Sequence, residues 1–384
     1  MPEILVRPCL EQDLDAYFAI RSLTYNDGLP IPEERRTSRF GERYLALLDD
    51  QPAGIFTALP MNATRGEALL PCAGVAGVAV LPDMRRGGVG ESTMTWACRH
   101  FRESGTPLSS LYAYREPFYS RVGYATVGKK LRFTVPTHRL PNVASDLPVR
   151  RLTPEDWREL LPCYAAFGHQ RSGTHVRSEL MWSRVLQENK PLTIYAAGDP
   201  VQGYIAVSHQ TAFWVDQWLS EVAWSTAEGY RAVLGIMRQL GINKTSMSWF
   251  EPSDSPFYAQ YLDQGIEVKV TGPVMFRVCD VPKALESLKP IGAGRFTLGV
   301  WDRQIPENEG PWQVEWADGR VDVRPFAGAP EVVARIGAFS QAFMGEPNLA
   351  DLARQGAIEV RSPEVLASAL SLLPPLPVFC GDTF

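Results

Sequence analysis

Residues 73–102 read AGVAGVAVLPDMRRGGVGESTMTWACRHFR, and this stretch carries the strongest structural signals of the chain. Its first part, Val75 to Leu81, is an apolar run with β-branched residues, typical of a buried strand and much too short to cross a bilayer. Pro82 and Asp83 interrupt the run, and from Glu91 the apolar residues recur at helical spacing. The stretch therefore predicts a strand, a turn and a helix, in that order.

The turn between the predicted strand and helix is basic and glycine-rich, with the sequence Arg85-Arg86-Gly87-Gly88-Val89-Gly90. Such a turn leaves backbone N–H groups unpaired at the helix N-terminus, where the helix dipole also favours an anion. The two arginine side chains add forked hydrogen-bond donors. We therefore predict that the turn holds a phosphate group; a solvated basic turn before a surface helix is the alternative interpretation.

Two common phosphate loops do not fit this turn. A Walker loop needs a lysine followed by Ser or Thr after the last glycine, and no lysine is present there. A Rossmann fingerprint needs Gly or Ala where Thr93 stands, and an acidic residue closing a second strand. What remains is Arg-x-x-Gly-x-Gly at Arg85, Gly88 and Gly90, which resembles the pyrophosphate loop of the GNAT superfamily of acyl-CoA-dependent N-acyltransferases.

The composition is that of a folded globular protein. Hydrophobic residues make up 45% of the 384 residues and charged residues 21%, which excludes a disordered chain. The length exceeds what one core usually serves, so we expect two or three domains. The net charge of −5 argues against nucleic acid as a partner and mildly favours cationic small molecules or lysine side chains.

Neither a membrane segment nor a metal site is predicted. Acidic residues come early in the chain and no apolar segment follows Met1, so we expect a cytoplasmic protein without membrane contact. The six cysteines are scattered, with no CxxC pair and no repeated spacing to histidine. This pattern predicts reduced thiols rather than a zinc site or a disulfide framework.

The order of predicted elements matches two related folds followed by a different one. The first domain, residues 1–140, reads strand, helix, three strands, helix, strand, helix and strand, the order that GNAT domains have; the last strand, Leu131 to Val135, is expected to close its sheet. The second domain, residues 146–285, repeats the pattern. Its central strand (217–224) leads almost directly into a helix (230–240) without an Arg-x-x-Gly-x-Gly turn, which predicts a degenerate, structural copy.

The third domain, residues 290–384, is predicted to be α+β. Strands are expected at 295–300, 312–316 and 320–324, and helices at 330–344, 349–355 and 363–373. The whole chain is thus assigned to the α/β class, α+β overall. Its last stretch, LLPPLPVFCGDTF, is apolar and ends on Phe384, so a buried terminus with a free carboxylate is an interpretation to consider beside ordinary fraying.

Several segments together resemble the Eis-type (enhanced intracellular survival) N-acetyltransferases over the whole chain: GVAVLPDMRRGGVG, AYREPFYSRVGY, the degenerate second copy and the terminal Phe. The resemblance implies tandem GNAT folds, the second inactive, followed by a sterol-carrier-like domain. It implies transfer of acetyl from acetyl-CoA to primary amines of aminoglycoside-like, polyamine or lysine substrates. It also implies a homo-oligomer, hexameric in that family.

The same resemblance assigns roles to residues. It places the pantetheine arm along the backbone of Val78, Ala79 and Val80, and the pyrophosphate at Arg86, Gly87, Gly88, Val89, Gly90 and Glu91, with Arg85 beside them. Tyr114 and Arg115 are further candidate cofactor contacts, where relatives usually have Ser-Glu-Gly-Gly.

Two residues are assigned to proton transfer. Tyr119, in Tyr119-Ser120-Arg121-Val122-Gly123-Tyr124, matches the family's general acid, and the terminal carboxylate of Phe384 matches its general base. A phenol with a pKa near 10 stays protonated at neutral pH and can protonate the departing thiolate, and a carboxylate can deprotonate the amine. Core packing is the alternative interpretation of Tyr119; Asp27 and Glu116 are the next candidates for the base.

A second class of function is considered beside the enzyme. The chain would then be a non-catalytic acyl-CoA-binding or lipid-carrier scaffold, with the ligand in the third domain. The Arg/Gly turn and Tyr119 favour the acetyltransferase.

Overall fold

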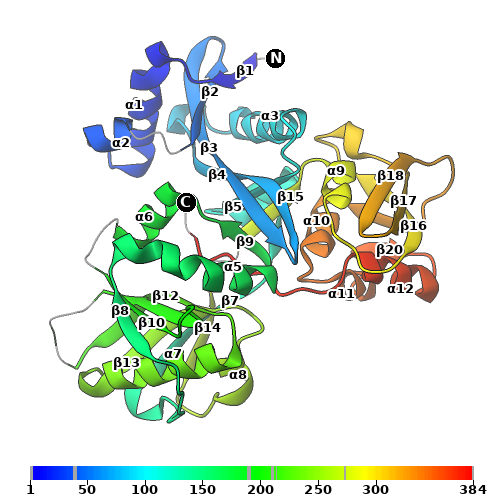
Figure 1. Cartoon of the computed structure of the whole chain (residues 1–384). Helices are drawn as coiled ribbons and strands as arrows, with labels where there is room; N and C mark the ends of the chain where they lie inside the picture. Colours follow the sequence, from blue (N-terminus) through cyan, green and yellow to red (C-terminus); the bar gives the residue numbers. More distant parts are fainter. Residues whose placement is uncertain are drawn as a thin grey trace.

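The computed structural model of the chain describes residues 3–37, 41–187, 192–208, 212, 214–271 and 274–382. These residues form three sheets with helices packed on their faces (Figure 1). No helix within the described ranges combines the length and the apolar character needed to cross a bilayer.

Eight described strands form the first sheet, in the order β1-β2-β3-β4-β5-β15-β6, with β9 beside β3. β4 and β5 are parallel, and the other pairs are antiparallel. A parallel neighbour requires a crossover connection, which α3 supplies. The strands are β1 (Ile4–Pro8), β2 (Glu42–Leu48), β3 (Gln51–Arg65), β4 (Ala68–Val80), β5 (Leu108–Tyr112), β6 (Ala125–Val127), β9 (Ser172–Val176) and β15 (Val274–Val278).

Helices cover both faces of this sheet (Figure 1). Tyr17 of α1 packs in one buried cluster with Ile55 of β3, and Met94 of α3 packs in another with Phe56. Ile55 and Phe56 are consecutive in a strand and point to opposite faces, so α1 and α3 lie on opposite sides. The helices are α1 (Leu14–Tyr25), α2 (Glu33–Thr37), α3 (Val89–Glu103) and α4 (Glu116–Arg121).

The second sheet repeats the arrangement of the first, with the order β14-β7-β13-β12-β11-β10-β8 in the described part of the chain. β12 and β13 are its parallel pair, and α7 connects them. The strands are β7 (Lys130–Pro136), β8 (Val149–Leu152), β10 (Thr193–Ala197), β11 (Gly203–Val207), β12 (Asp216–Trp224), β13 (Ser246–Glu251) and β14 (Glu267–Thr271). The helices are α5 (Leu161–His169), α6 (Glu179–Gln187), α7 (Ala227–Leu240) and α8 (Pro256–Gln260).

The two sheets exchange one strand each. β7 was expected to close the first sheet, and this prediction is wrong: β7 pairs with β13 and β14 in the second sheet. Its place in the first sheet, between β5 and β6, is taken by β15. The alternating pattern of residues 131–135 predicts a strand correctly, but a pattern of period two does not specify the partner. The predicted limits 1–140, 146–285 and 290–384 stay predictions.

The third sheet has the order β18-β17-β16-β19-β20 among the described residues. Residues 330–335 were expected to begin a helix, and this is wrong for Val332–Arg335, which form β19 beside β16; the helix α10 begins at Ile336. The strands are β16 (Gly294–Trp301), β17 (Trp312–Ala317), β18 (Arg320–Pro325), β19 and β20 (Ile358–Val360). The helices are α9 (Val281–Glu286), α10 (Ile336–Met344), α11 (Leu349–Arg354) and α12 (Pro363–Leu372).

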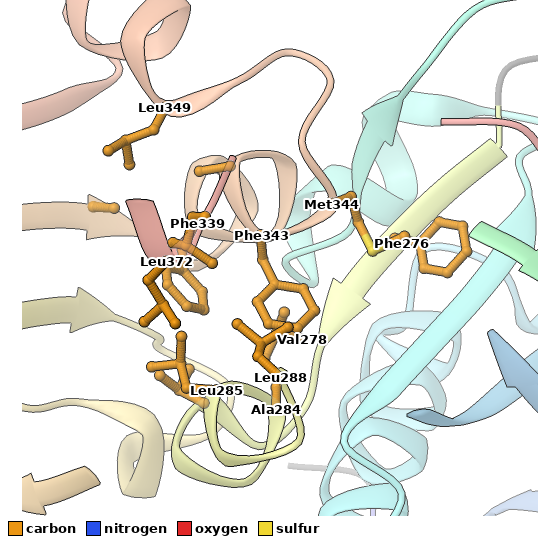
Figure 2. Close-up of a cluster of buried hydrophobic side chains, with 14 of the residues drawn as sticks. Phe276, Val278, Ala284, Leu285, Leu288, Phe339, Phe343, Met344, Leu349 and Leu372 are labelled. Atoms are coloured by element: carbon orange, nitrogen blue, oxygen red, sulfur yellow. The ribbon is translucent and has the colours of Figure 1, made fainter. Parts of the chain in front are cut away.

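One apolar core joins the first sheet to the third. Phe276 and Val278 of β15 belong to the same buried cluster as Phe343 of α10 and Leu372 of α12. Figure 2 shows Phe343 lying beside Val278 and Leu288. Because β15 is at once a strand of the first sheet and a wall of this core, the third part of the chain is fixed against the first.

Candidate active site

A wedge opens in the first sheet between β4 and β5. The two strands pair only over residues 72–74 and 108–110. Beyond Gly74, β4 continues to Val80 with β3 as its neighbour, while β5 pairs with β15 along its whole length on its other edge. Among the described strands, none pairs with the backbone of β4 from Val75 to Val80 on the side of the wedge.

A bulge in β4 lies at this wedge. The pairing of β3 with β4 jumps from Thr57 opposite Ala76 to Ile55 opposite Ala79, so Gly77 and Val78 together face one residue of β3. Gly77 has a φ of +59°, in the left-handed region where a side chain is strained. Such a bulge bends the strand and re-aims its backbone groups. The predicted pantetheine contacts, Val78 to Val80, thus lie where β4 borders the wedge.

The basic turn lies at the end of β4 and is exposed at residues 85–88. Arg86 and Gly88 have φ values of +69° and +85°, and Gly88 is the N-cap of α3. No side chain caps this helix N-terminus, so its first N–H groups stay available to an anion. Arg85 Nε donates to the Val80 carbonyl at 3.1 Å, which ties the turn to the end of β4.

The turn is packed against α4. A side chain at Gly90 would place its Cβ 3.1 Å from the ring of Phe118, closer than ordinary van der Waals contact. Phe118 in turn meets Tyr119 edge to face, with ring centroids 4.8 Å apart. The predicted phosphate turn and the predicted acid are therefore connected through one aromatic ring.

Tyr119 is buried on α4, with 8% of its surface exposed. Burial, and to a smaller extent the nearby Tyr25, raise the pKa of the Tyr119 hydroxyl above its ordinary value near 10. The described part of the chain contains no hydrogen-bond partner for this hydroxyl. Tyr119 is therefore a protonated phenol that is free to donate.

Tyr25 is a neighbour of the wedge to which the sequence assigned no secure role. It ends α1, and its hydroxyl donates to the Val78 carbonyl at 2.6 Å, inside the bulge. Burial raises the pKa of the Tyr25 hydroxyl as well. A helical stripe predicts which residues of α1 face the sheet, but it does not predict that the last residue reaches the bulge.

The remaining predicted residues lie around this centre. Tyr114 and Arg115 are exposed at the turn before α4, with Tyr114 almost fully in solvent. Glu116 is exposed and accepts a hydrogen bond from Thr126 Oγ1 at 2.9 Å, and Asp27 is exposed after α1. Phe384 lies outside the described residues. Across the described ranges, no group of three His, Cys, Asp or Glu side chains is arranged to hold a metal ion.

Comparison with known proteins assigns the two ends of the chain. Residues 6–127 match the acetyltransferase (GNAT) domain. This part of the chain is similar to GNAT acetyltransferase domains. Residues 281–381 match the sterol carrier protein domain. The GNAT match contains the wedge, the turn and Tyr119, and ends with β6.

The relatives extend this assignment. N-acetyltransferase Eis of Mycobacterium bovis (strain ATCC BAA-935 / AF2122/97) is 31% identical over 137 residues, which are 33% of this chain and 34% of that protein. N-acetyltransferase Eis of Mycobacterium tuberculosis (strain CDC 1551 / Oshkosh) is 31% identical over 134 residues, 33% of each chain. The matched segment thus spans about a third of the length of these curated relatives.

Solved structures share the complete fold. The GCN5-related N-acetyltransferase from Anabaena variabilis ATCC 29413 has a TM-score of 0.88 at 18% identity and covers 100% of both chains. Eis1 from Mycobacterium abscessus has a TM-score of 0.81 at 19% identity, again with 100% of both chains covered. The predicted fold class, a GNAT domain, a second GNAT-like fold and a sterol-carrier-like domain, is confirmed.

The second GNAT-like fold lacks the features that make the first a phosphate site. β12 runs into α7 through Ser225 and Thr226, and Thr226 Oγ1 accepts from Gly229 N at 2.9 Å, so the helix caps itself. A side chain at Gly229 would place its Cβ 2.0 Å from the Gln202 carbonyl oxygen. This helix N-terminus is therefore both capped and packed against backbone, as expected for a degenerate copy.

Proposed function

We propose that the protein is an acetyl-CoA-dependent N-acetyltransferase that acts on primary amines of aminoglycoside-like, polyamine or lysine substrates. The observation that carries the proposal is the uncapped N-terminus of α3 at the end of a bulged strand, in the same part of the structure as the buried Tyr119 with its raised hydroxyl pKa. Acetyl transfer from acetyl-CoA needs a site that binds the pyrophosphate anion, a strand backbone that can bind the pantetheine arm, and a proton donor for the departing thiolate.

Binding of acetyl-CoA is assigned to three groups of residues. The backbone N–H groups from Gly87 to Glu91 and the Arg86 side chain bind the pyrophosphate, because they combine a helix dipole with forked donors. The backbone of Val78 to Val80 binds the pantetheine arm along the wedge. Tyr114 and Arg115 contact the outer part of the cofactor; their exposure beside α4 is compatible with this role.

Proton transfer is assigned to Tyr119 and the chain end. Tyr119 protonates the departing thiolate, and a backbone N–H at the wedge stabilises the oxyanion. The Phe384 carboxylate removes the proton from the amine. The position of Cys380, four residues before Phe384, supports the role of the terminal carboxylate as base. The Tyr112 hydroxyl, at the end of β5, donates to the Cys380 carbonyl at 2.9 Å.

The test is release of coenzyme A from acetyl-CoA in the presence of polyamines, aminoglycosides and lysine peptides. Release that depends on one of these amines supports the enzyme. Tight binding of acetyl-CoA without release from any of them supports the scaffold hypothesis instead. The cytoplasmic location and the hexamer stay predictions.

The assignment of the basic turn at residues 85–90 to the pyrophosphate can be tested by measuring acetyl-CoA binding, without an activity assay. Arg86→Ala is expected to raise the dissociation constant of acetyl-CoA about 10- to 100-fold, because one charge-assisted contact to the pyrophosphate is lost. Calorimetry measures the change. Arg320→Ala, which removes an exposed arginine from β18, is the matched control and should leave binding unchanged. Equal affinity in Arg86→Ala and the parent protein would contradict the pyrophosphate assignment.

The terminal base can be tested by extending the chain. Two residues, Gly-Ser, added after Phe384 are expected to abolish acetylation and to leave acetyl-CoA binding intact, because the carboxylate moves while the turn does not. Turnover, calorimetry and thermal unfolding are measured on the same protein. Full activity with an unchanged melting temperature would exclude the terminal carboxylate and direct attention to Asp27 and Glu116.

A further inference from the structure

The second sheet contains a wedge like that of the first. β12 and β13 pair in parallel only over residues 216–218 and 246–248 and then separate. A small cavity of about 50 Å³ lies where they separate, and β12 lines it from Leu219 to Ala223. Phe379 and Gly381, from the other end of the chain, line the same cavity. The wedge of the degenerate copy thus borders the chain's own C-terminal segment, residues 377–382.

Backbone hydrogen bonds hold the first half of this C-terminal segment to β9. Ser172 N donates to the Pro377 carbonyl at 2.9 Å, and Phe379 N donates to the Ser172 carbonyl at 2.9 Å. Thr174 Oγ1 donates to the Phe379 carbonyl at 3.0 Å. The Phe379 ring packs edge to face on Phe167 of α5, in the core of the second sheet. Residues 377–379 are therefore fixed between β9, which belongs to the first sheet, and the core of the second sheet.

The buried Arg177 binds the second half of the C-terminal segment, at Asp382. Arg177 Nε donates to Asp382 Oδ1 at 2.7 Å, and both side chains are 3% exposed. Another nitrogen of the same guanidinium donates to Glu221 of β12 at 2.7 Å. The guanidinium also lies 4.3 Å from the centre of the Tyr164 ring and 4.6 Å from that of Trp182. Arg177 thus connects the wedge strand β12 directly to the C-terminal segment.

The first sheet contacts the same segment from the other side. The Tyr112 hydroxyl donates to the Cys380 carbonyl at 2.9 Å, and Cys380 Sγ lies 3.5 Å from His175 Nδ1. Tyr112 ends β5 where β4 and β5 have separated. In Figure 1 the red C-terminal stretch returns from α12 to this region between the first two sheets.

We propose that the Arg177–Asp382 ion pair is a positioning element for acetyl transfer, and that the second GNAT-like fold uses its wedge to hold the C-terminal segment at the site of the first. The inference rests on the proposed function, in which a base on the chain end acts in the first-sheet wedge. Arg177 and Asp382 touch no reacting atom themselves. They fix residues 377–382, on which the place of the base depends.

The energetics favour a positioning role over a purely stabilising one. Removing two charges from water costs several kcal/mol for each ion, and a buried pair of this kind often adds no net stability compared with apolar side chains. An arginine that binds two carboxylates through different nitrogens does, however, fix the position of one carboxylate relative to the other. The pair is thus better suited to define a geometry than to increase the free energy of unfolding.

The test replaces Asp382 by asparagine, which keeps the shape and leaves Arg177 its bond to Glu221. Asp382→Asn is expected to lower kcat at least tenfold with an unchanged KM for acetyl-CoA. Carboxypeptidase should also remove residues from its C-terminus faster, as mass spectrometry measures. Asp254→Asn is the matched control, because Asp254 pairs with the buried Arg171 at 2.9 Å and does not bind the C-terminal segment.

The outcomes separate the hypotheses. Faster trimming with an unchanged kcat would overturn the positioning role, and so would a trimming rate equal to that of the parent protein. A loss of kcat that Asp254→Asn reproduces, together with the same fall in melting temperature, would show a merely structural effect and also overturn it. If the parent protein releases no coenzyme A with any amine, the proposed function fails, and the trimming rates still report on the ion pair.

Discussion

Tyr119→Phe is expected to lower kcat about 100-fold or more and to leave the KM for acetyl-CoA unchanged. The substitution removes only the hydroxyl, and proton donation by a positioned acid is typically worth at least this factor. The ring stays between Phe118 and Tyr124, so the packing of α4 is retained. Steady-state kinetics with the best amine of the panel measures both constants.

The pH dependence of kcat also tests the role of Tyr119 as the general acid. Because burial raises the pKa of the Tyr119 hydroxyl above 10, the acid form persists throughout the neutral and mildly alkaline range. We therefore expect no fall in kcat caused by this group below about pH 10.

Tyr258→Phe, on the exposed face of α8, is the control for Tyr119→Phe and should have the same kcat as the parent protein. A kcat for Tyr119→Phe equal to that of the control would refute the role of general acid.

Asp302→Ala is expected to lower the free energy of unfolding by about 3–5 kcal/mol, the usual cost of leaving a buried charge unpaired. Arg277 Nη2 donates to both oxygens of Asp302, at 2.8 and 2.9 Å, and neither side chain is exposed. Arg277 Nη1 donates to the Val122 carbonyl at 2.7 Å. The loss therefore affects the contact between the first sheet, which contains β15, and the chain after β16.

An exposed pair provides the control for this substitution. Asp322 and Arg324 on β18 form an ion pair with 53% and 68% of their side-chain surfaces exposed. Asp322→Ala is expected to change the free energy of unfolding by about 1 kcal/mol or less, because solvent screens exposed pairs. Urea titration measures both proteins. A loss in Asp302→Ala no larger than that in Asp322→Ala would contradict the importance of the buried pair.

The centre of the GNAT domain could be predicted from sequence because its signals are local. The apolar run ends at Leu81 where β4 ends at Val80, and α3 begins at Val89, directly after the glycines. Tyr119 was found on its short helix for the same reason. In each case the residue types that form the element lie within a few positions of one another.

The parts that sequence missed depend on contacts between distant residues. The strand at 131–135 was predicted, but its partners β13 and β14 come more than 100 residues later. The hydrogen bond from Tyr25 to Val78 and the ion pair of Arg177 with Asp382 join residues 53 and 205 positions apart. No periodic pattern reports on such pairs. For Val332–Arg335, pairing with β16 outweighed the helical pattern that follows.

The strand exchange affects how the protein can be made. β15 lies between β5 and β6, so the first sheet has a gap until Val278, roughly 150 residues beyond Val127, has left the ribosome. At synthesis rates of about 5–20 residues per second the gap lasts about 8–30 s. During this time β5 and β6 expose unpaired backbone edges that attract other strands. The GNAT domain therefore does not finish folding ahead of the rest of the chain, and a nascent chain of this protein needs protection against aggregation until both sheets close together.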